Sequence, residues 1–395
     1  MTFLMPNYSP APVRFVAGSG AHLTDSEGRD YLDFLAGIAV VALGHANPAV
    51  QAAIAEQAGT LLHVSNLFES GLNEEVAELL DWLIGDGSPA GGKVFFANSG
   101  AEANECAIKL ARRFGGRGRH TVVSAYGSFH GRTLATLHAT GQPAKHEAFA
   151  PLPEGFRHVA YGDLDALDTA LDPSVVSGLL LEVIEGENGV VPAPPGYLAR
   201  ARELCSERGI LLMLDEIQTG LGRTGRWFAF QREGVVPDVV TMAKALGNGV
   251  PVGACWARAD VAEVFRPGDH GSTFGGQPLA MSAARATLQT MIEMDAPAVT
   301  TKMGEYLANS VAALDGVVSV RGEGLLRAAV LEEGLDAAAV TSTALARGLI
   351  INAPVAGVLR FAPPYIISEA EVDQATAILK TVLDDALAER SAKAH

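Results

Sequence analysis

The amino-acid sequence predicts an α/β fold: a large domain with a mostly parallel sheet flanked by helices, followed by a smaller α+β domain. Short apolar runs alternate with helical patterns through the middle of the chain, which is typical of β-α-β units. From about residue 290 this alternation gives way to helical stretches mixed with short strands. The chain of 395 residues is long enough to bury a core in both domains.

The strands expected in the large domain are six runs rich in apolar residues. They cover residues 93–98, 121–127, 178–186, 209–217, 238–246 and 252–257. Helical stretches at 102–114 and 195–209 separate several of them. Because ligands bind at the carboxyl ends of the strands in such sheets, motifs that directly follow a strand are the first candidates for a site.

The second domain is predicted from a helical stretch and three short strands. The helix covers residues 302–316, and the strands cover 317–324, 349–353 and 358–364. No flexible linker separates the two domains, so we expect them to pack closely. The expected division is an N-terminal segment packed with the small domain (1–45), the large domain (46–285) and the small domain (286–395).

Composition limits the classes of partner. The net charge of −16 disfavours nucleic acid and anionic membranes as general partners. The three cysteines are widely separated, form no CxxC and are interpreted as free thiols in a reducing compartment. The N-terminus lacks the basic region of a secretory signal, and no apolar run is long enough to span a bilayer. These observations predict a cytoplasmic protein.

The first candidate site follows the strand at 93–98. Ser99 and Glu102 are spaced as a capping box, which needs no ligand. The same start of a helix can also bind a phosphate through its free N–H groups and its dipole. Both interpretations remain open from the spacing alone.

Two further candidates follow apolar strands. Asp215 and Glu216 end the strand at 209–217; such acids usually form turns or caps, but a buried carboxylate can also keep a pyridinium nitrogen protonated. Lys244 lies between two alanines just after a strand. A lone lysine is usually solvated, whereas desolvation would lower its pKa and make the amine a nucleophile.

Two arginines have apolar neighbours. Arg132 lies three residues after Phe129, and Arg360 lies within the strand at 358–364. Simple packing is the plainer interpretation, but the aromatic ring suits a flat ligand and the guanidinium groups suit carboxylates.

A dinucleotide site and a metal site are both disfavoured. Residues 220–225 match G-x-G-x-x-G, but the preceding strand ends at Asp215, and Asp238 opens the next strand instead of closing it. The ten histidines show no HExxH pattern, so no metal is predicted. His130 and His138 could share a helical face, although a core or surface position is the plainer interpretation.

Taken together, the motifs resemble the class III (ω-amino acid) aminotransferases, a subgroup of the fold-type I pyridoxal-phosphate enzymes. The resemblance extends from Ala36 to Pro364 and includes eight motifs in order. They are AGIAV with LGH, NSGAEANE, FHGRT, EGENG, DEIQTGLGRTG, AKALGNG, HGSTFGGQP and RFAPP. Within this family the chain is most similar to the bacterial acetylornithine aminotransferases.

The resemblance implies that the cofactor is pyridoxal 5′-phosphate. Lys244 would hold it covalently and move a proton, while Asp215 would pair with the pyridine nitrogen. Gln218 would donate to the phenolic oxygen, and Phe129 and Ile217 would cover the two faces of the ring.

The phosphate group would be bound by two subunits. Ser99, Gly100 and Ala101 would bind it from their own chain. Thr273 would reach it from a neighbouring subunit, so the resemblance also implies a homodimer with shared active sites.

The resemblance further assigns three residues to the substrates. Arg132 would bind the carboxylate remote from the reacting amine, and Arg360 would bind the α-carboxylate of glutamate or 2-oxoglutarate. Glu187 would pair with Arg360 whenever an ω-amine occupies the site.

The implied reaction transfers the terminal amine of N-acetylornithine to 2-oxoglutarate, as in arginine biosynthesis. Related ω-aminotransferases acting on succinylornithine, ornithine, 4-aminobutyrate or N-succinyl-diaminopimelate are the alternatives. The chain departs from the family at Val41, where asparagine is common, at Ala101, where threonine is common, and at Glu185, where glutamine is usual.

Overall fold

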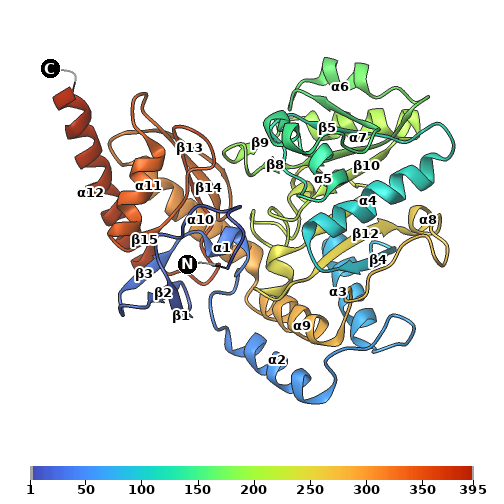
Figure 1. Cartoon of the computed structure of the whole chain (residues 1–395), viewed down its shortest axis with the longest axis horizontal. Coiled ribbons are helices and arrows are strands. Elements are labelled where there is room, and N and C mark those ends of the chain that lie inside the picture. Colours follow the sequence, from blue (N-terminus) through green and yellow to red (C-terminus); the bar gives the residue numbers. More distant parts are fainter. Residues whose placement is uncertain (1–2, 394–395) are drawn as a thin grey trace.

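The computed structural model describes residues 3–393, and its centre is a seven-stranded sheet (Figure 1). The strand order is β4 (Gly92–Ala97), β12 (Gly253–Arg258), β11 (Val239–Met242), β10 (Leu211–Asp215), β7 (Val176–Glu182), β5 (Thr121–Ala125) and β6 (Phe156–Val159). Strand β12 runs antiparallel to both of its neighbours, and the β11-β10-β7-β5-β6 pairings are parallel. The predicted mostly parallel sheet is confirmed.

Alternation of side chains along the central strands builds a core on each face of the sheet. In β7, Leu179 and Leu181 join one apolar cluster, and Leu180 joins another. Strand β10 alternates in the same way, with Leu212 on one side and Met213 on the other. Because both faces are covered, these strands are apolar throughout, as parallel strands in α/β proteins usually are.

Helices cover both faces of this sheet. Helix α4 (Gly100–Gly115) packs on β7, β11 and β12, and α7 (Tyr197–Arg208) packs on β10. The other helices of this part are α2 (Pro48–Thr60), α3 (Leu72–Ile84), α5 (Leu134–Ala139), α6 (Leu164–Ala170), α8 (Ala259–Ala262) and α9 (Pro278–Glu293).

The two ends of the chain share one sheet. Strands β1 (Phe15–Ser19), β2 (His22–Asp25) and β3 (Asp30–Asp33) form an antiparallel unit, and β3 pairs in parallel with β15 (Leu349–Ile350). A second sheet contains β13 (Val317–Glu323), β14 (Leu326–Leu331) and β16 (Val358–Phe361). These sheets pack with α10 (Ala296–Ala312), α11 (Ala337–Ala346) and α12 (Glu369–Lys393).

The predicted divisions at residues 45 and 285 remain predictions, but position 285 lies inside a helix. Helix α9 continues to Glu293 and packs on α2 and α3. We therefore propose that the division lies in the turn at Met294–Asp295, between α9 and α10.

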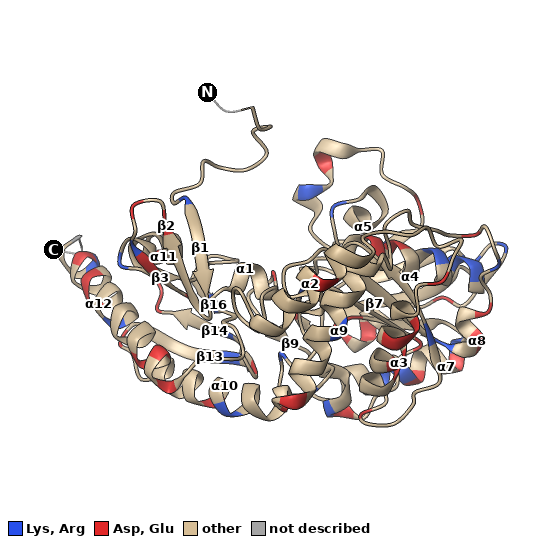
Figure 2. Ribbon diagram, turned by 90° about the horizontal axis from the view of Figure 1, so that it is seen from below, with Lys and Arg blue, Asp and Glu red and all other residues tan. Residues whose placement is uncertain are grey.

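The short elements lie mostly in the connections. They are α1 (Ala36–Ala39), η1 (Pro143–Lys145), η2 (Glu147–Phe149), η3 (Ala229–Glu233), η4 (Lys244–Gly247) and the hairpin of β8 (Ile184–Glu185) and β9 (Val191–Pro192). Among residues 3–393, no helix combines the length and the apolar character that crossing a membrane requires. Lysines, arginines, aspartates and glutamates are interspersed along α12, and the N-terminal stretch runs away from the body of the molecule (Figure 2).

Candidate active site

Lys244 projects into a cavity of about 380 Å³ at the carboxyl ends of the strands. Strand β11 ends at Met242, and the next turn begins with Lys244 itself, whose φ of 43° is unusual for a residue with a side chain. Such strained backbone often occurs at functional sites. Burial lowers the pKa of the Lys244 amine, and the positive charge of Arg360 lowers it further. The amine is therefore easier to deprotonate and a better nucleophile.

Asp215 lines the same cavity from the end of β10, and its carboxylate is held by three donors. Oδ2 lies 2.8 Å from Asn104 Nδ2 and 2.8 Å from His130 Nδ1, and Oδ1 accepts from the Ile217 amide at 3.1 Å. Thr241 fixes Asn104 in turn, because its hydroxyl donates to Asn104 Oδ1 at 2.7 Å. This network orients the carboxylate from behind.

The beginning of α4 forms another wall of the cavity. Ser99 is the N-cap and accepts from the Glu102 amide at 3.2 Å, while Glu102 Oε2 accepts from the Asn98 amide at 2.6 Å. Only half of the expected capping box is therefore present, because Glu102 accepts from the amide before the N-cap and not from that of Ser99; the first turn of the helix lines the cavity through Ser99, Gly100 and Ala101. A Cβ on Gly100 would lie 2.7 Å from the Ile217 side chain, so glycine keeps this approach open.

Phe129, Ile217 and Gln218 line the cavity beside the lysine. The Phe129 amide donates to Glu182 Oε1 at 2.8 Å, which fixes the start of the loop. Gln218 Oε1 is buried and has no partner among the described residues. A ligand ring with a polar edge could fill this space, because such an amide group is costly to leave unpaired.

Arg360 lies on β16, where its side chain is buried and paired with Glu187. Its Nη1 donates to Glu187 Oε1 at 2.7 Å and to the Gly186 carbonyl at 3.2 Å, and its Nε donates to Asn352 Oδ1 at 3.1 Å. Nη2 has no partner within the described chain. Burial alone would raise the pKa of Glu187, but the positive charges of Arg360, Lys244 and Lys145 together lower it.

The sequence did not indicate Lys145 or Glu182 as site residues. The Lys145 ammonium and the Arg132 guanidinium each lie 5.6 Å from the centre of the Phe129 ring. Burial lowers the pKa of Lys145, and Arg132 lowers it further. Burial raises the pKa of Glu182, which favours the neutral form of this carboxyl. Lys145 lies in no recognisable local pattern, whereas Glu182 ends β7 opposite Asp215, and its position at a strand end is a signal that could have indicated it.

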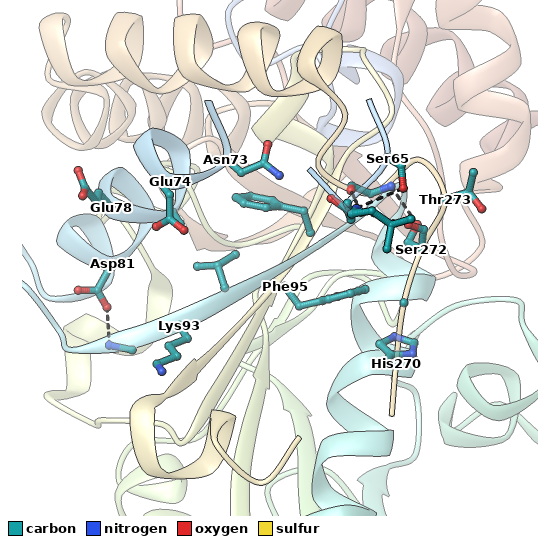
Figure 3. A pocket seen from close by; sticks show the side chains of 18 of the residues that line it. Ser65, Asn73, Glu74, Glu78, Asp81, Lys93, Phe95, His270, Ser272 and Thr273 are labelled. Carbon is teal, nitrogen blue, oxygen red and sulfur yellow. Dashed lines mark hydrogen bonds between the residues drawn. The ribbon is translucent and has the colours of Figure 1, made fainter. Parts of the chain in front are cut away.

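Thr273 does not lie in the lysine cavity of its own chain. It is exposed on the rim of a larger cavity of about 1040 Å³, between α3, β4 and the loop 270–275 (Figure 3). This cavity contains no pairing of a buried lysine with an acid, so the smaller one is the better candidate for chemistry. Asn98 connects the two, because its Nδ2 donates to Ser272 Oγ at 3.1 Å.

Other sequence candidates have structural positions. His130 is not helical, because α5 begins at Leu134; the shared helical face suggested for His130 and His138 is wrong. Within the glycine-rich motif at 220–225, Gly225 lies against Thr301 of α10. Among residues 3–393, no group of three histidines, cysteines or acids is placed to hold a metal ion.

The whole arrangement matches a known family. Residues 4–383 match the family model described as aminotransferase class III. The chain belongs to this family, and it is an aminotransferase. The predicted fold-type I class is thereby confirmed.

The most similar relatives carry a more particular name. A Corynebacterium efficiens protein named acetylornithine aminotransferase is 48% identical over 385 residues, which cover 96% of this chain and 94% of the relative. A Caldanaerobacter subterraneus protein of the same name is 46% identical, with 97% of this chain and 98% of the relative covered.

Solved structures agree at the level of the fold. Ornithine aminotransferase from Toxoplasma gondii superposes with a TM-score of 0.92 and 33% identity, covering 98% of this chain and 94% of the other. N-acetylornithine aminotransferase from Stenotrophomonas maltophilia gives a TM-score of 0.83 and 36% identity, with coverage of 96% and 98%.

Proposed function

We propose that this aminotransferase moves the δ-amino group of N-acetylornithine to 2-oxoglutarate, giving N-acetylglutamate semialdehyde and glutamate, in arginine biosynthesis. The observation that carries the proposal is the buried Arg360, which holds an exchangeable carboxylate partner, Glu187, near Lys244. The names of the most similar relatives support the same donor.

The cavity fits pyridoxal 5′-phosphate as the cofactor. Its length runs from the helix start at Gly100 and Ala101, which suits a phosphate, to the carboxylate of Asp215, which suits a pyridinium nitrogen. Lys244 would hold the cofactor covalently, and Gln218 would bind its phenolic oxygen. When bound, the cofactor supplies an electron sink for the carbanion formed at the amine-bearing carbon of the substrate.

Lys244 is proposed to move the proton. Burial lowers the pKa of its amine, so this amine gives up a proton more readily than that of an exposed lysine. It would take the proton from the amine-bearing carbon of the substrate and deliver it to the C4′ carbon of the cofactor. Phe129 and Ile217 would exclude water from the two faces of the ring.

Two different substrates must use one site in turn. When N-acetylornithine presents its δ-amine, it has no carboxylate next to the reacting carbon, so Glu187 can keep Arg360 neutralised. When glutamate presents its α-amine, its α-carboxylate can replace Glu187 on the guanidinium. The exchange is chemically balanced, because one carboxylate substitutes for another in a desolvated, charge-assisted hydrogen bond.

The remote carboxylate of N-acetylornithine is assigned to Arg132. Arg132 and Lys145 both lie beside the Phe129 ring, so two cations flank the mouth of the cavity. The charge of the pair favours an anionic group at this position.

A homodimer is part of the proposal. Thr273 and Leu67 line the larger cavity from two loops, and the next residue in each loop, Phe274 and Phe68, is also exposed. Such a gathering of exposed apolar side chains favours contact with another protein. A second copy placed here would bring its own Thr273 to this chain's phosphate site. A cytoplasmic location remains a prediction from the sequence.

The proposed function is tested in half-reactions. Purified protein loaded with cofactor is mixed separately with N-acetylornithine, ornithine, 4-aminobutyrate and glutamate, without a keto acid. Absorbance follows conversion of the aldehyde form of the cofactor to its amine form. Rapid conversion by N-acetylornithine and glutamate, with slow conversion by the others, supports the proposal. If glutamate reacts but N-acetylornithine does not, the chain remains an aminotransferase and the proposed donor is wrong.

A further inference from the structure

The glycine-rich loop 220–225 contains a buried arginine that no step of the proposed reaction uses. Arg223 is 1% exposed, and no carboxylate among residues 3–393 pairs with its guanidinium group. Its Nε and Nη2 have no hydrogen-bond partner within the same residues. A guanidinium group stays charged in proteins, and burying it without an acid is costly. The contacts that Arg223 does make are therefore expected to serve the structure or the reaction.

Arg223 binds the C-terminal part of the chain at two carbonyl groups. Its Nη1 donates to the Pro363 carbonyl at 2.5 Å and to the Leu325 carbonyl at 3.1 Å, and the Leu325 amide donates to the Arg223 carbonyl at 2.9 Å. The guanidinium group also lies over the ring of Tyr365, 4.5 Å from its centre. A Cβ on Gly324 would lie 2.4 Å from the Arg223 carbonyl oxygen, so a glycine is needed for this close approach. One residue thus holds two separate segments together.

These two segments bracket the strand pair that carries Arg360. Leu325 directly precedes β14, and Pro363 follows the end of β16. In the antiparallel register of the two strands, Ala328 lies opposite Arg360. Because Arg223 holds the beginning of one strand and the end of the other, a displacement of Arg223 would move Arg360 with the pair.

The loop of Arg223 is connected at its other end to the lysine cavity. It directly follows Gln218, which lines that cavity. The Gly220 amide donates to the Glu216 carbonyl at 2.9 Å, and the buried Glu216 carboxylate accepts from the Phe230 amide at 3.0 Å. Buried, satisfied hydrogen bonds of this kind make a segment rigid. The loop is therefore a stiff connection between the cavity wall and Arg223.

We propose that Arg223 is a positioning residue for amine transfer, which fixes the place of Arg360 relative to the lysine cavity. Lys244 follows a strand of the seven-stranded sheet, whereas Arg360 lies on a separate sheet (Figure 1). A substrate held by both residues reacts only when their relative geometry is correct. The inference rests on the proposed function, in which Arg360 binds the α-carboxylate of glutamate or 2-oxoglutarate.

A positioning role predicts a selective effect on the two donors. Glutamate would use Arg360 through its α-carboxylate, whereas N-acetylornithine has no carboxylate next to its reacting carbon. A displaced Arg360 should therefore impair the reaction with glutamate and leave that with N-acetylornithine nearly unchanged. A purely structural role of Arg223 would impair both reactions alike, because loss of folded protein lowers every rate.

The experiment measures half-reactions of the cofactor-loaded protein by absorbance in Arg223→Met and Arg223→Lys. In Arg223→Met, the glutamate concentration that gives half the maximal conversion rate should rise ~10-fold, with a change below ~2-fold for N-acetylornithine. Arg223→Lys keeps the charge and can still donate to a carbonyl, so it should show the same selectivity with a rise of only ~3-fold. The lysine variant also keeps the test valid if the methionine variant does not fold.

Arg327→Met is the matched control. Arg327 also donates to two carbonyls, those of Gly324 at 2.9 Å and Gly322 at 2.6 Å, but both belong to the connection between β13 and β14. This variant should leave the reactions with both donors unchanged.

Arg360→Lys separates a failure of this inference from a failure of the proposed function. It should impair glutamate selectively; if it does not, the role assigned to Arg360 is wrong, and the inference about Arg223 is overturned with it. If Arg360→Lys is selective but the Arg223 variants impair both donors alike, or neither, the positioning role of Arg223 alone is overturned. If another ω-amine proves to be the donor, that amine replaces N-acetylornithine in every comparison.

Discussion

Glu185 stands where the resemblance implies a glutamine, and its environment is unusual for an acid. The side chain is fully buried, Oε2 accepts from Asn188 Nδ2 at 2.8 Å, and Oε1 has no partner among the described residues. Burial raises its pKa to about 7. The family's glutamine would keep a similar shape without a proton to lose.

This environment predicts a pH-dependent stability. The pKa of Glu185 is higher in the folded chain than in the unfolded chain, so the protonated side chain stabilises the fold. This contribution to the free energy of unfolding is complete below the pKa of the unfolded chain and is lost as pH rises through about 7. Between about pH 5 and about pH 8, the free energy of unfolding should therefore fall less in Glu185→Gln than in wild type. The difference between the two losses should be ~1–3 kcal/mol. Urea unfolding at both pH values measures the difference. Glu389→Gln, at an exposed position on α12, should follow wild type, and equal losses for Glu185→Gln and wild type would refute the prediction.

Lys145 gives a second prediction at the scale of one residue. If it helps Arg132 to attract the remote carboxylate, Lys145→Met should raise KM for N-acetylornithine about 5-fold, which corresponds to ~1 kcal/mol, with a smaller change in kcat. Steady-state kinetics at fixed 2-oxoglutarate measure both constants. Lys302→Met is the control, because Lys302 pairs with Glu369 on the surface between α10 and α12. An unchanged KM would remove Lys145 from the substrate site.

Individual residues differ in how far the sequence could place them. Lys244 and Asp215 follow buried strands, so the rule for α/β sheets was enough to make them candidates. Lys145 reaches the side of Phe129 only through the tertiary fold, whereas Glu182 lines the cavity from the end of β7 and falls under the same rule. Asn104 is a further case: it lies in a helix, yet it donates to Asp215 across the sheet, and no local pattern indicates this contact.

At the scale of elements, α4 performs two functions with one cap. Its N-cap, Ser99, stabilises the helix and also lies at the wall of the cavity. Ser99→Ala should lower the free energy of unfolding by ~1 kcal/mol and weaken retention of the cofactor. Urea unfolding and release of cofactor on dialysis measure the two effects.

A second cap separates these effects. Asp336 caps α11, accepting from the Ala338 and Ala339 amides, and it belongs to the C-terminal part of the chain. Asp336→Ala should cost similar stability and leave cofactor retention unchanged. If both variants release cofactor equally, the role assigned to Ser99 is wrong.

Most helices and strands of the large domain were predictable, because the spacing of apolar residues and the local composition indicate them without knowledge of the tertiary fold. The six expected strands of the large domain all lie on observed strands. Their ends were less predictable: the run at 178–186 bends after Glu182 into the separate β8, and the run at 238–246 ends at Met242 before the turn of η4. In both places the chain leaves the sheet to line the cavity, which apolar character alone does not reveal.

At the scale of the whole molecule, the proposed homodimer accounts for the exposed apolar residues near Thr273. Leu67 is 86% exposed and lines the larger cavity. A charge placed here would be buried against the second copy, so Leu67→Glu should dissociate the dimer. Sedimentation velocity measures the molecular mass, and Thr273 would then be withdrawn from the phosphate site.

Leu164→Glu is the control, because Leu164 is 39% exposed on α6, and α6 lies far from α3 and β4, which line the larger cavity (Figure 1). It should leave the assembly unchanged. A wild-type protein that sediments as a monomer would contradict the proposed assembly directly. Thr273 lies outside the lysine cavity of its own chain, so the role proposed for it requires a second copy of the chain, which one sequence does not place.

Asn98 lines the lysine cavity and is hydrogen-bonded to Ser272, which lines the larger cavity. Its backbone amide is fixed by Glu102 at the helix start, and its side chain holds Ser272 in the loop that carries Thr273. In the proposed dimer, cofactor binding and subunit association would therefore be coupled, because both would favour the same arrangement of Asn98. Each event would strengthen the other by the same coupling free energy. Dilution would then loosen the cofactor, and adding cofactor would tighten the dimer by an equal factor.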